Sequence, residues 1–403
     1  MLSACVIIIQ MPLGLYISVP FCRTKCTYCN FASDVFSHAI FEKYVSRLCD
    51  EIGSAKQTAS QMDGCLDRAV DSIYFGGGTP TLLDVAQLER IFVTIRQNFA
   101  VHADAEITVE CAPGTLSEPR VEVLNRCGVN RVSLGVQSFV DYEAASVGRL
   151  HMRDVVLDDI ARLRSAGISH INVDLIAGLP HQTRESWQHS LDELIACGVQ
   201  HASVYMLEVD EDSRLGRELI AGGQKYHAHF VPGEELTADF YEVACERLNG
   251  AGIRQYEISN FARAGFESRH NLKYWTRQPY LGFGVDAHSM LLATDANSAV
   301  RFSNPDSLEK YVAGEAKTRS IIDPEFALQE AFFLGLRMNC GVSLHELANS
   351  FGEIAMASYA DGIADLIAAG LLTRENDAVR LTSRGRLLSN EVFERFISVD
   401  STL

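Results

Sequence analysis

The sequence predicts an α/β fold: an incomplete parallel (β/α)6 barrel followed by a C-terminal, mostly helical, winged-helix-like domain. Short β-rich runs alternate with helix-periodic stretches through the first half, which is typical of parallel strands joined by right-handed crossovers. Several of these runs are apolar throughout, as strands buried on both faces are. At 403 residues the chain exceeds the length at which a single core stops growing, so a second domain is expected.

Six runs rich in Val, Ile, Tyr or Phe mark the predicted strands. We expect functional groups at their C-terminal ends, where parallel barrels place their ligands. A doubly wound open sheet remains an alternative, because the sequence does not determine whether the sheet closes. The runs are GLYISVPF (14–21), DSIYFGG (71–77), EITVECAP (106–113), RVSLGVQS (131–138), HINVDLIAGL (170–179) and HASVYMLEV (201–209).

The stretches between the strands carry helix signals. After the second run, Asp84 is a good N-cap, and the apolar residues that follow it keep the 3.6-residue repeat. The helices expected before residues 170 and 201 end on Gly167 and Gly198, in the position after the C-cap that favours glycine. The apolar residues of the first helix are Val85, Leu88, Ile91, Phe92, Ile95 and Phe99.

Changes of pattern along the chain predict the domain boundaries. The alternation gives a barrel over residues 13–236, preceded by an extension over residues 1–12. Residues 237–320 are rich in Gly and aromatic residues, and we expect a linking region of loops and short strands packed on the barrel. Residues 321–403 form the winged-helix-like domain. Their residues 371–395 hold five Arg against four Asp or Glu, too weak a balance for DNA binding, so we expect a packing or recognition module.

Composition restricts partners and location. The net charge of −17 disfavours binding to a phosphate backbone, so no nucleic-acid partner is expected. The apolar start, MLSACVIIIQMPLG, lacks the basic region of a signal peptide and is too short to span a bilayer, which predicts a cytoplasmic protein without stable membrane insertion. Most cysteines stand singly among apolar or helical neighbours. We expect seven of them to be buried small hydrophobes: Cys49, Cys65, Cys111, Cys127, Cys197, Cys245 and Cys340.

Three further cysteines, Cys22, Cys26 and Cys29, follow the first strand at C-x3-C-x2-C spacing. A tetrahedral zinc site needs four ligands, and no second Cys/His pair with suitable spacing is evident. A disulfide would leave one thiol over in a compartment that discourages disulfides. Three thiolates can instead hold three irons of a [4Fe-4S] cluster and leave the fourth iron open to a ligand.

Polar residues are expected at the same rim as these cysteines. The consecutive glycines of YFGGGTPT let the backbone approach a polar ligand with its N–H and C=O groups free to bond it. Glu110 ends the third strand, Gln137 ends the fourth, Asp174 lies in the fifth, and Arg149 follows the fourth. A surface ion pair or a strand-end cap explains any one of them alone. Together they predict a ligand site at the rim of the barrel.

The cysteine spacing, with an aromatic residue before the last cysteine, resembles the signature of radical S-adenosylmethionine (SAM) proteins. The resemblance implies that SAM chelates the open iron through its methionine amino and carboxylate groups. It further implies that one electron from the cluster cleaves SAM to a 5′-deoxyadenosyl radical. Carried over by position, the residues implied to bind SAM are Tyr16, Tyr28, Gly77, Gly78, Thr79, Glu110, Gln137, Arg149 and Asp174.

Five motifs narrow the resemblance to the oxygen-independent coproporphyrinogen III oxidase group, over most of residues 13–290. They are LYISVPFC, YFGGGTPT, LGVQSF, DLIAGLPHQT and YEISNFA. The authentic oxidases resemble C-x3-C-x2-C-x-C, whereas Phe31 stands at the last position here. The sequence is similar instead to the haem chaperone branch of the group, the HemW-type proteins, whose H-N-x-x-Y-W motif is reproduced at His270, Asn271, Tyr274 and Trp275.

The resemblance implies that His270 ligates haem iron, since an imidazole can bind the iron and Tyr and Trp rings can face the macrocycle. Without it, a lone histidine is more often a hydrogen-bonded core residue, and an aromatic pair is more often packing. Asp286 stands in YLGFGVDAHS where the resemblance leads us to expect a small residue. His288 is a second candidate iron ligand, or a partner of Asp286, and ranks below His270.

Two main hypotheses follow. The favoured one is a haem chaperone that carries a [4Fe-4S] cluster and SAM, takes up haem and delivers it to haem-requiring, especially respiratory, proteins, without coproporphyrinogen oxidase activity. The resemblance also makes a homodimer plausible. The alternative is an enzyme, oxygen-independent coproporphyrinogen III dehydrogenase, whose radical abstracts hydrogen from the propionate side chains. A third hypothesis is a radical enzyme that acts on an unrelated substrate and keeps the haem motif as a vestige.

Overall fold

The computed structural model describes residues 11–293 and 298–397, so residues 1–10 of the predicted extension lie outside the described residues. Six strands, β1 to β6, neighbour one another in chain order within a 12-stranded sheet. Each of them pairs in parallel with the next. Their bounds are β1 (Leu13–Val19), β2 (Ala69–Gly77), β3 (Ala100–Cys111), β4 (Arg131–Gln137), β5 (His170–Ala177) and β6 (His201–Met206).

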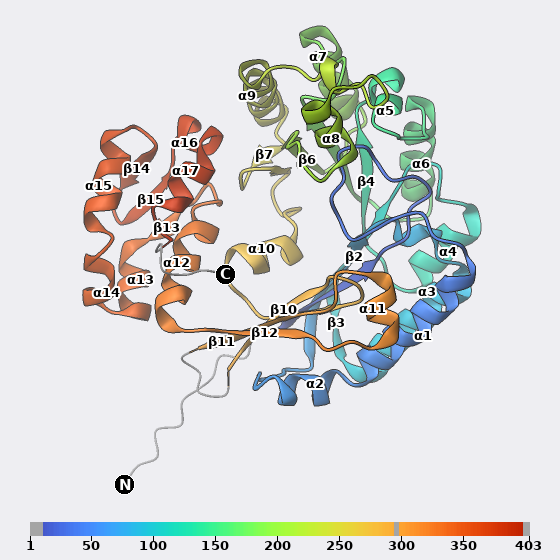
Figure 1. Cartoon of the computed structure of the whole chain (residues 1–403), viewed down its shortest axis with the longest axis horizontal. Helices are drawn as coiled ribbons and strands as arrows, with labels where there is room; N and C mark the ends of the chain where they lie inside the picture. Colours follow the sequence, from blue (N-terminus) through green and yellow to red (C-terminus); the bar gives the residue numbers. More distant parts are fainter. Residues whose placement is uncertain (1–10, 294–297, 398–403) are drawn as a thin grey trace.

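This strand order decides between the two predicted architectures. A doubly wound sheet reverses its order at a switch point, whereas β1 to β6 advance in one direction, as in a barrel. The longer helices lie along the outside of this sheet (Figure 1) and bury their apolar sides against it. They are α1 (Ala39–Gly53), α3 (Val85–Asn98), α4 (Glu118–Arg126), α6 (Arg153–Ser165), α7 (Arg184–Ala196) and α9 (Glu234–Gly250).

The predicted helix signals are confirmed. Asp84 accepts a hydrogen bond from the backbone N–H of Gln87 at 2.8 Å, and the Gln87 side chain accepts one from the N–H of Asp84, which completes a capping box at the start of α3. Gly167 and Gly198 adopt φ values of 86° and 62° just past the ends of α6 and α7. These left-handed conformations stop both helices at little cost, because glycine has no Cβ.

Residues after α9 extend the sheet at both edges. The strand β9 pairs in parallel with β1, and three antiparallel strands continue from it, while β8 and β7 follow β6 at the other edge. The short strands expected in this region are therefore hydrogen-bonded into the barrel sheet itself. Their bounds are β7 (Arg254–Gln255), β8 (Asn260–Ala262), β9 (Tyr280–Phe283), β10 (His288–Leu292), β11 (Ala299–Ser303) and β12 (Thr318–Ile322).

The C-terminal region has a core of its own, in which the side chains of Leu328, Phe332, Val379 and Phe396 meet. Its elements follow the order helix, strand, helices, two strands and closing helices, as predicted for a winged-helix-like domain. It stands beside the barrel in Figure 1. The elements are α12 (Pro324–Gly335), β13 (Val342–Ser343), α13 (Leu344–Phe351), α14 (Glu353–Ala357), α15 (Ala360–Ala368), β14 (Leu372–Glu375), β15 (Ala378–Leu381), α16 (Ser383–Leu387) and α17 (Ser389–Glu394).

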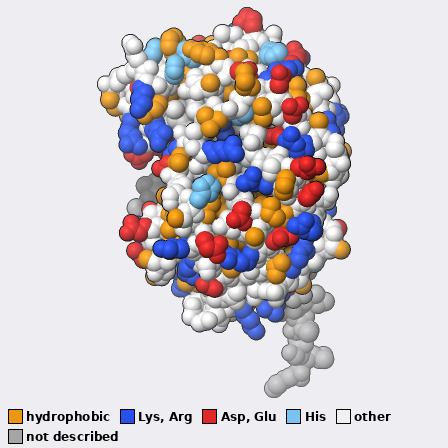
Figure 2. All heavy atoms as spheres, turned by 90° about the vertical axis from the view of Figure 1, so that its right-hand side faces the viewer, with side chains coloured by type: hydrophobic (Ala, Val, Ile, Leu, Met, Phe, Trp, Pro, Cys, Tyr) orange, Lys and Arg blue, Asp and Glu red, His pale blue; other side chains and the backbone are white. Residues whose placement is uncertain are grey.

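Shorter helices occupy the remaining connections. On the face formed by the outer helices, acidic and basic side chains are interspersed, which is typical of a solvent-facing layer (Figure 2). None of the helices in the described ranges is both long and apolar enough to cross a membrane. The shorter helices are α2 (Ala55–Gln61), η1 (Pro80–Leu82), α5 (Asp141–Ser146), α8 (Arg214–Ala221), η2 (Ala228–Phe230), α10 (Arg269–Trp275) and α11 (Leu308–Ala313).

The prediction for the seven single cysteines is only partly confirmed. Cys111 and Cys127 are buried, but Cys65 and Cys340 are exposed, and the other three are half-buried. Cys65 follows a turn at Gly64, where its backbone N–H donates to the Leu292 carbonyl and its side chain remains at the surface. Apolar neighbours in the sequence therefore do not by themselves place a cysteine in the core.

Candidate functional site

The loop that carries the three cysteines follows β1, with Cys22 three residues after the end of the strand. It is anchored to two other segments at the same rim. The Thr24 hydroxyl donates to the Gly148 carbonyl at 2.8 Å, and the Thr27 N–H donates to the Val147 carbonyl at 3.2 Å. The N–H of Leu215, in α8, donates to the Thr27 carbonyl at 2.8 Å. Segments that follow β4 and β6 thus hold the cysteine loop over the C-terminal end of the barrel.

The thiols of Cys22, Cys26 and Cys29 are half-buried and influence one another. Burial raises the pKa of Cys22 most, and the other two cysteines raise it further, while Ser33 and Thr79 lower it. In the described ranges no three Cys, His, Asp or Glu groups could enclose a single metal ion. A [4Fe-4S] cluster takes each of its cysteine ligands on a different iron, so three thiols on one loop fit it better than a mononuclear ion.

The backbone N–H groups of the glycine-rich turn after β2 are hydrogen-bonded within the protein, contrary to the prediction. The Gly78 N–H donates to the Val19 carbonyl at 2.8 Å, the Thr79 N–H donates to the Phe21 carbonyl at 2.7 Å, and the Gly77 N–H bonds Glu110. The prediction that these N–H groups are free for a ligand is therefore wrong. A Cβ at Gly78 would lie 2.7 Å from the Phe21 carbonyl oxygen, so glycine is needed to bring this turn against the cysteine loop.

Two carboxyl groups lie close together behind this turn. Glu110 accepts hydrogen bonds from the Tyr74 hydroxyl at 2.9 Å and from the Gly77 N–H. Burial, reinforced by the charge of Asp174, raises its pKa to about 7. Burial also raises the pKa of Asp174, whose carboxylate accepts bonds from Ser133 and Asn172. The rim therefore presents two carboxyls, one of which changes charge near neutral pH.

Arg149 links these carboxyls to the cysteine loop. Its guanidinium donates to the Tyr28 hydroxyl at 3.2 Å. Burial alone would lower the pKa of Arg149, but Tyr28, Cys26 and Asp174 raise it above the usual value, so the group stays charged. Its buried Nε has no hydrogen-bond partner among the described residues. A buried, charged donor without a partner is suited to an anionic or carbonyl group of a ligand.

Gln137 adopts a strained backbone at the end of β4. Its φ of 71° lies in the left-handed region, and the pairing of β4 with β5 shifts between Gly135 and Gln137. A buried non-glycine residue in this conformation costs free energy, and such residues concentrate at ligand sites. The structure thus brings Gln137 to the same rim as Glu110, Arg149 and Asp174.

A layer of aromatic rings separates this rim from the other end of the barrel. Tyr16 and Tyr74 are register partners on β1 and β2, and their ring centroids lie 6.1 Å apart. The His270 ring stacks below both, 5.4 Å from Tyr74 and 6.4 Å from Tyr16. Tyr16 therefore lies inside the barrel, between the cysteine end and the helix α10 that carries His270.

His270 is buried, with 1% of its surface exposed, and both of its ring nitrogens are hydrogen-bonded. Nδ1 contacts the Ser72 hydroxyl at 3.1 Å, and Nε2 contacts the Tyr274 hydroxyl at 2.8 Å. Burial, aided by Lys273 and Arg131, lowers its pKa to about 3, so the ring is neutral. The imidazole closes the N-terminal end of the barrel, opposite the cysteine loop.

The other predicted haem residues lie around α10. Asn271 belongs to the first turn, where its N–H donates to the Ser268 hydroxyl at 3.4 Å. Trp275 has a buried Nε1 without a partner in the described residues, and the Arg337 guanidinium lies 4.3 Å from its ring centroid. Trp275 thus faces the C-terminal domain rather than the barrel interior.

His288 and Asp286 lie apart from His270, at the end of β9 and the start of β10. The Nε2 of His288 is 3.9 Å from the Asp286 carboxylate, and both side chains are exposed, which confirms the predicted proximity. Asp286 has a φ of 56°. The small residue expected at this position would adopt that left-handed conformation at lower cost.

Several polar interior residues escaped the prediction. Within β5, the side-chain amide of Asn172 donates to Asp174 at 2.7 Å. Its side-chain carbonyl oxygen lies 2.6 Å from Nδ1 of His201, on the neighbouring strand β6. Glu106 holds the start of α10 by accepting from the N–H groups of Arg269 and His270 at 3.0 and 3.1 Å. The available signal was alternation: Asn172 and Asp174 share one face of β5, and polar residues on that face exclude a dry core.

Comparisons with known proteins identify the families and relatives that this chain resembles. The model of the radical SAM superfamily matches residues 16–194, and the model of the HemN C-terminal domain matches residues 322–388. The chain is 34% identical over 389 residues to the protein named heme chaperone HemW from Bacillus subtilis (strain 168), covering 95% of this chain and 98% of the relative.

Two further similarities extend the comparison. The bovine protein named radical S-adenosyl methionine domain-containing protein 1, mitochondrial, is 33% identical, with 82% of this chain and 74% of the relative covered. The solved structure of coproporphyrinogen III oxidase (HemN) from Escherichia coli, a radical SAM enzyme, superimposes with a TM-score of 0.79 at 24% identity, covering 96% of this chain and 90% of that one. The latter similarity establishes the fold.

Proposed function

Because the chain belongs to the heme chaperone HemW family of radical SAM proteins, we propose that it binds haem and delivers it to haem-requiring proteins, respiratory ones in particular. Haem is the cargo in this proposal, whereas a [4Fe-4S] cluster and SAM are resident cofactors. The function is carried out in the cytoplasm, where reducing conditions keep the cysteine thiols available.

Phe31 is the residue that favours a chaperone over an oxidase. It occupies the place of the fourth cysteine expected of the oxidases, and 64% of its surface is exposed. This residue departs from the C-x3-C-x2-C-x-C pattern expected of the oxidases, while the three cysteines that the cluster needs are all present. We therefore propose that the protein does not decarboxylate coproporphyrinogen III.

The residues at the cysteine rim are suited to both resident cofactors. We assign Cys22, Cys26 and Cys29 to the cluster, which when bound supplies single electrons. We assign the surrounding polar groups to SAM, because the partnerless Nε of Arg149 and the paired carboxyls can bind a zwitterionic ligand. The proposed SAM residues are Tyr16, Tyr28, Glu110, Gln137, Arg149 and Asp174, together with Gly77, Gly78 and Thr79 through their oxygen atoms, because the N–H groups of these three are engaged within the protein.

His270 remains the proposed haem-iron ligand of the H-N-x-x-Y-W motif, together with Asn271, Tyr274 and Trp275. In the conformation described, Nε2 of His270 is hydrogen-bonded to the Tyr274 hydroxyl, and Nδ1 is hydrogen-bonded to the Ser72 hydroxyl. Iron can bind the imidazole only after one of these bonds is exchanged. We therefore propose that haem binding at His270 is coupled to a displacement of α10.

An anaerobic haem titration followed at the Soret band tests this proposal. Wild type is compared with His270→Ala and with His189→Ala, at matched cluster content. We expect wild type and His189→Ala to bind haem tightly with a shifted Soret band, and His270→Ala to lose the tightly bound species. His189 is the matched control because its side chain is 50% exposed and belongs to α7, outside the haem motif.

The same samples distinguish the alternative enzyme. If wild type binds haem no more tightly than an unrelated protein without a haem site, and turns over coproporphyrinogen III with a reductant, the chaperone proposal is wrong. Sedimentation of the protein with and without its cluster examines the homodimer, which we propose only for the cluster-loaded form.

A further inference from the structure

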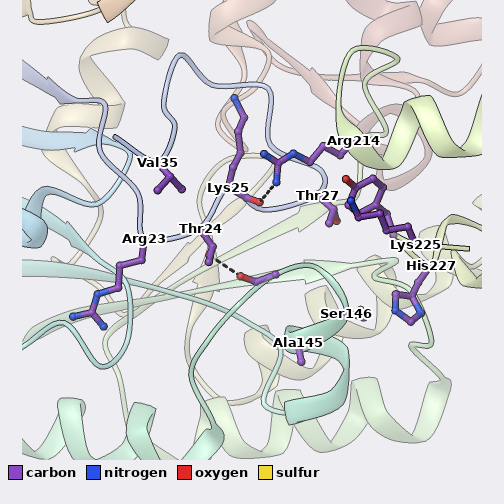
Figure 3. A pocket seen from close by; sticks show the side chains of 12 residues that line it. Arg23, Thr24, Lys25, Thr27, Val35, Ala145, Ser146, Arg214, Lys225 and His227 are labelled. Carbon is purple, nitrogen blue, oxygen red and sulfur yellow. Dashed lines mark hydrogen bonds between the residues drawn. The ribbon is translucent and has the colours of Figure 1, made fainter. Parts of the chain in front are cut away.

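An open pocket of about 420 Å³ lies on the outer side of the cysteine loop (Figure 3). Its volume is in the range of small-molecule sites, about 300–1,000 Å³. Arg23, Lys25, Arg214 and Lys225 contribute to its lining, and no acidic side chain among the described residues does. In a chain of net charge −17, this is a local concentration of positive charge. The pocket is therefore suited to an anionic ligand.

The pocket also contains one imidazole, that of His227. Its Nδ1 lies 3.0 Å from Nε2 of His181, on the loop after β5. The two loops are joined by a backbone hydrogen bond from His181 to Phe230 at 3.0 Å. Both histidines adopt left-handed conformations, with φ values of 69° for His181 and 61° for His227. Two strained residues in contact indicate a specified arrangement rather than a loose surface loop.

This arrangement prepares His227 to ligate a metal. Histidines that bind metals almost always engage their second ring nitrogen with a partner, which fixes the orientation of the ring. His181 is that partner for Nδ1, whereas Nε2 of His227 has no hydrogen bond within the described part of the chain. The Glu218 carboxylate fixes the segment by accepting from the N–H groups of Lys225 and Tyr226 at 2.9 and 2.8 Å.

The surroundings are suited to a flat, partly apolar ligand with carboxylates. Tyr226 and Val35 provide aromatic and apolar lining. Lys225 lies beside His227, and the Arg214 guanidinium points toward Lys25, to whose carbonyl it donates at 3.3 Å (Figure 3). Haem combines these features: an iron that accepts imidazole, an apolar macrocycle and two propionates. His270, by contrast, is enclosed at the opposite end of the barrel with both ring nitrogens occupied.

We propose that incoming haem docks first in this pocket, with Nε2 of His227 on the iron and the propionates on Arg214 and Lys225. The inference rests on the proposed function, because it takes haem as the cargo. It adds an entry site that is accessible in the conformation described, next to the cysteine loop. Haem then reaches His270 only when α10 opens.

Anaerobic haem titrations of three full-length variants, His227→Ala, His229→Ala and Lys225→Glu, test the entry site. We expect His227→Ala to slow haem association or weaken binding at least tenfold, while His229→Ala behaves as wild type. His229 belongs to the same segment but does not line the pocket. Equal melting temperatures across the set show that each variant is folded.

Haem dimethyl ester, whose esterified propionates carry no charge, measures how much the propionate charges contribute to binding in this pocket. We expect Lys225→Glu to weaken the binding of haem but to leave the binding of the ester unchanged. If His227→Ala and Lys225→Glu match wild type with both ligands while His270→Ala loses binding, the entry site is refuted and the chaperone proposal stands. If wild type itself binds no haem, both proposals fail.

Discussion

Glu110 is a residue at the rim whose charge is sensitive to pH near neutrality. Burial and Asp174 raise its pKa from about 4.5 to about 7. Between these values the folded protein holds a proton that the unfolded chain has released, so the free energy of unfolding falls as pH rises through this window. The loss amounts to about 3 kcal/mol when complete above pH 7.

Glu110→Gln should remove this contribution. Urea unfolding of the variant should show a smaller decrease in the free energy of unfolding between pH 5 and 7.5 than wild type does. Glu89→Gln is the control, because Glu89 is half-exposed and pairs with Arg126 at the surface. Identical pH profiles for wild type and Glu110→Gln would show that the carboxyl is ionised throughout this range.

The three cysteines should be individually essential for the cluster. Replacing Cys22, Cys26 or Cys29 by Ala leaves two thiolates where three irons need protein ligands, so reconstituted protein should lose its broad iron-sulfur absorbance. Cys49→Ala should keep full iron content, since Cys49 packs on the outer side of the sheet within α1. Equal iron content in all four variants would contradict the assignment.

Some site residues could be predicted from the sequence and others could not. Glu110, Gln137 and Asp174 follow from position, because the ends of parallel strands converge at one rim. Tyr74 could not be predicted, because its role depends on the register that places it beside Tyr16. The engaged N–H groups of the glycine turn also depend on tertiary contacts, namely the approach of Gly78 to β1.

At the scale of elements, α10 is a short helix held in place by polar contacts. Glu106 accepts from the backbone N–H groups of Arg269 and His270 and from the Ser268 hydroxyl. Hydrogen bonds to a charged group contribute about 1.5–3 kcal/mol each. Glu106 should therefore oppose the displacement of α10 that haem binding at His270 requires.

Glu106→Ala should loosen α10. We expect amide hydrogen exchange in residues 268–275 to accelerate at least tenfold, because about 1.4 kcal/mol of lost stabilisation corresponds to a factor of ten in local opening. Asp104→Ala is the matched control: Asp104 is 3.6 Å from Arg269 but its side chain is 79% exposed. Unchanged exchange in Glu106→Ala would mean that packing, and not this carboxylate, holds the helix.

The barrel elements were predictable and the edge strands were not. β1 to β6 carry long apolar runs, and the capped helix α3 carries a 3.6-residue repeat, so local pattern and tertiary environment agree. β7 has two residues and β8 has three, too few for a period-2 pattern. β3 starts at Ala100, six residues before the predicted start, because Ala100 and Val101 already pair with Ala69 and Val70 of β2.

At the scale of the whole molecule, the C-terminal domain is joined to the barrel by a buried ion cluster. Glu330, in α12, is 1% exposed and lies 3.1 Å from Nε of Arg277 and 2.7 Å from a guanidinium nitrogen of Arg301. The contact with Arg301 is an ion pair without hydrogen-bond geometry, which leaves that carboxylate oxygen dependent on Coulomb attraction. Both arginines belong to the barrel side.

Glu330→Ala should therefore destabilise the protein by about 3 kcal/mol, because it removes the carboxylate that two partly buried cations share. Chemical unfolding measures this change, and limited proteolysis should show the C-terminal domain cleaved first. Asp306→Ala removes an exposed partner of Lys310 and should change the free energy of unfolding by less than about 1 kcal/mol. A Glu330→Ala variant as stable as Asp306→Ala would show that apolar packing alone joins the domains.

The two ends of the barrel therefore differ in access. The N-terminal end is closed by α10. The C-terminal domain contacts α10 through Arg337 on Trp275, and it contacts the chain just beyond α10 through Glu330 on Arg277. The cysteine end has the open basic pocket.

Transfer of haem to an apo-protein distinguishes a haem chaperone from a coproporphyrinogen III oxidase. Cluster-loaded protein is charged with haem under anaerobic conditions and mixed with apo-myoglobin, and the Soret band of each partner is followed after separation. We expect haem to leave this protein and appear in myoglobin, while coproporphyrinogen III is not consumed in a parallel reaction with a reductant. Conversion of coproporphyrinogen III without stable haem binding or transfer would contradict the chaperone proposal.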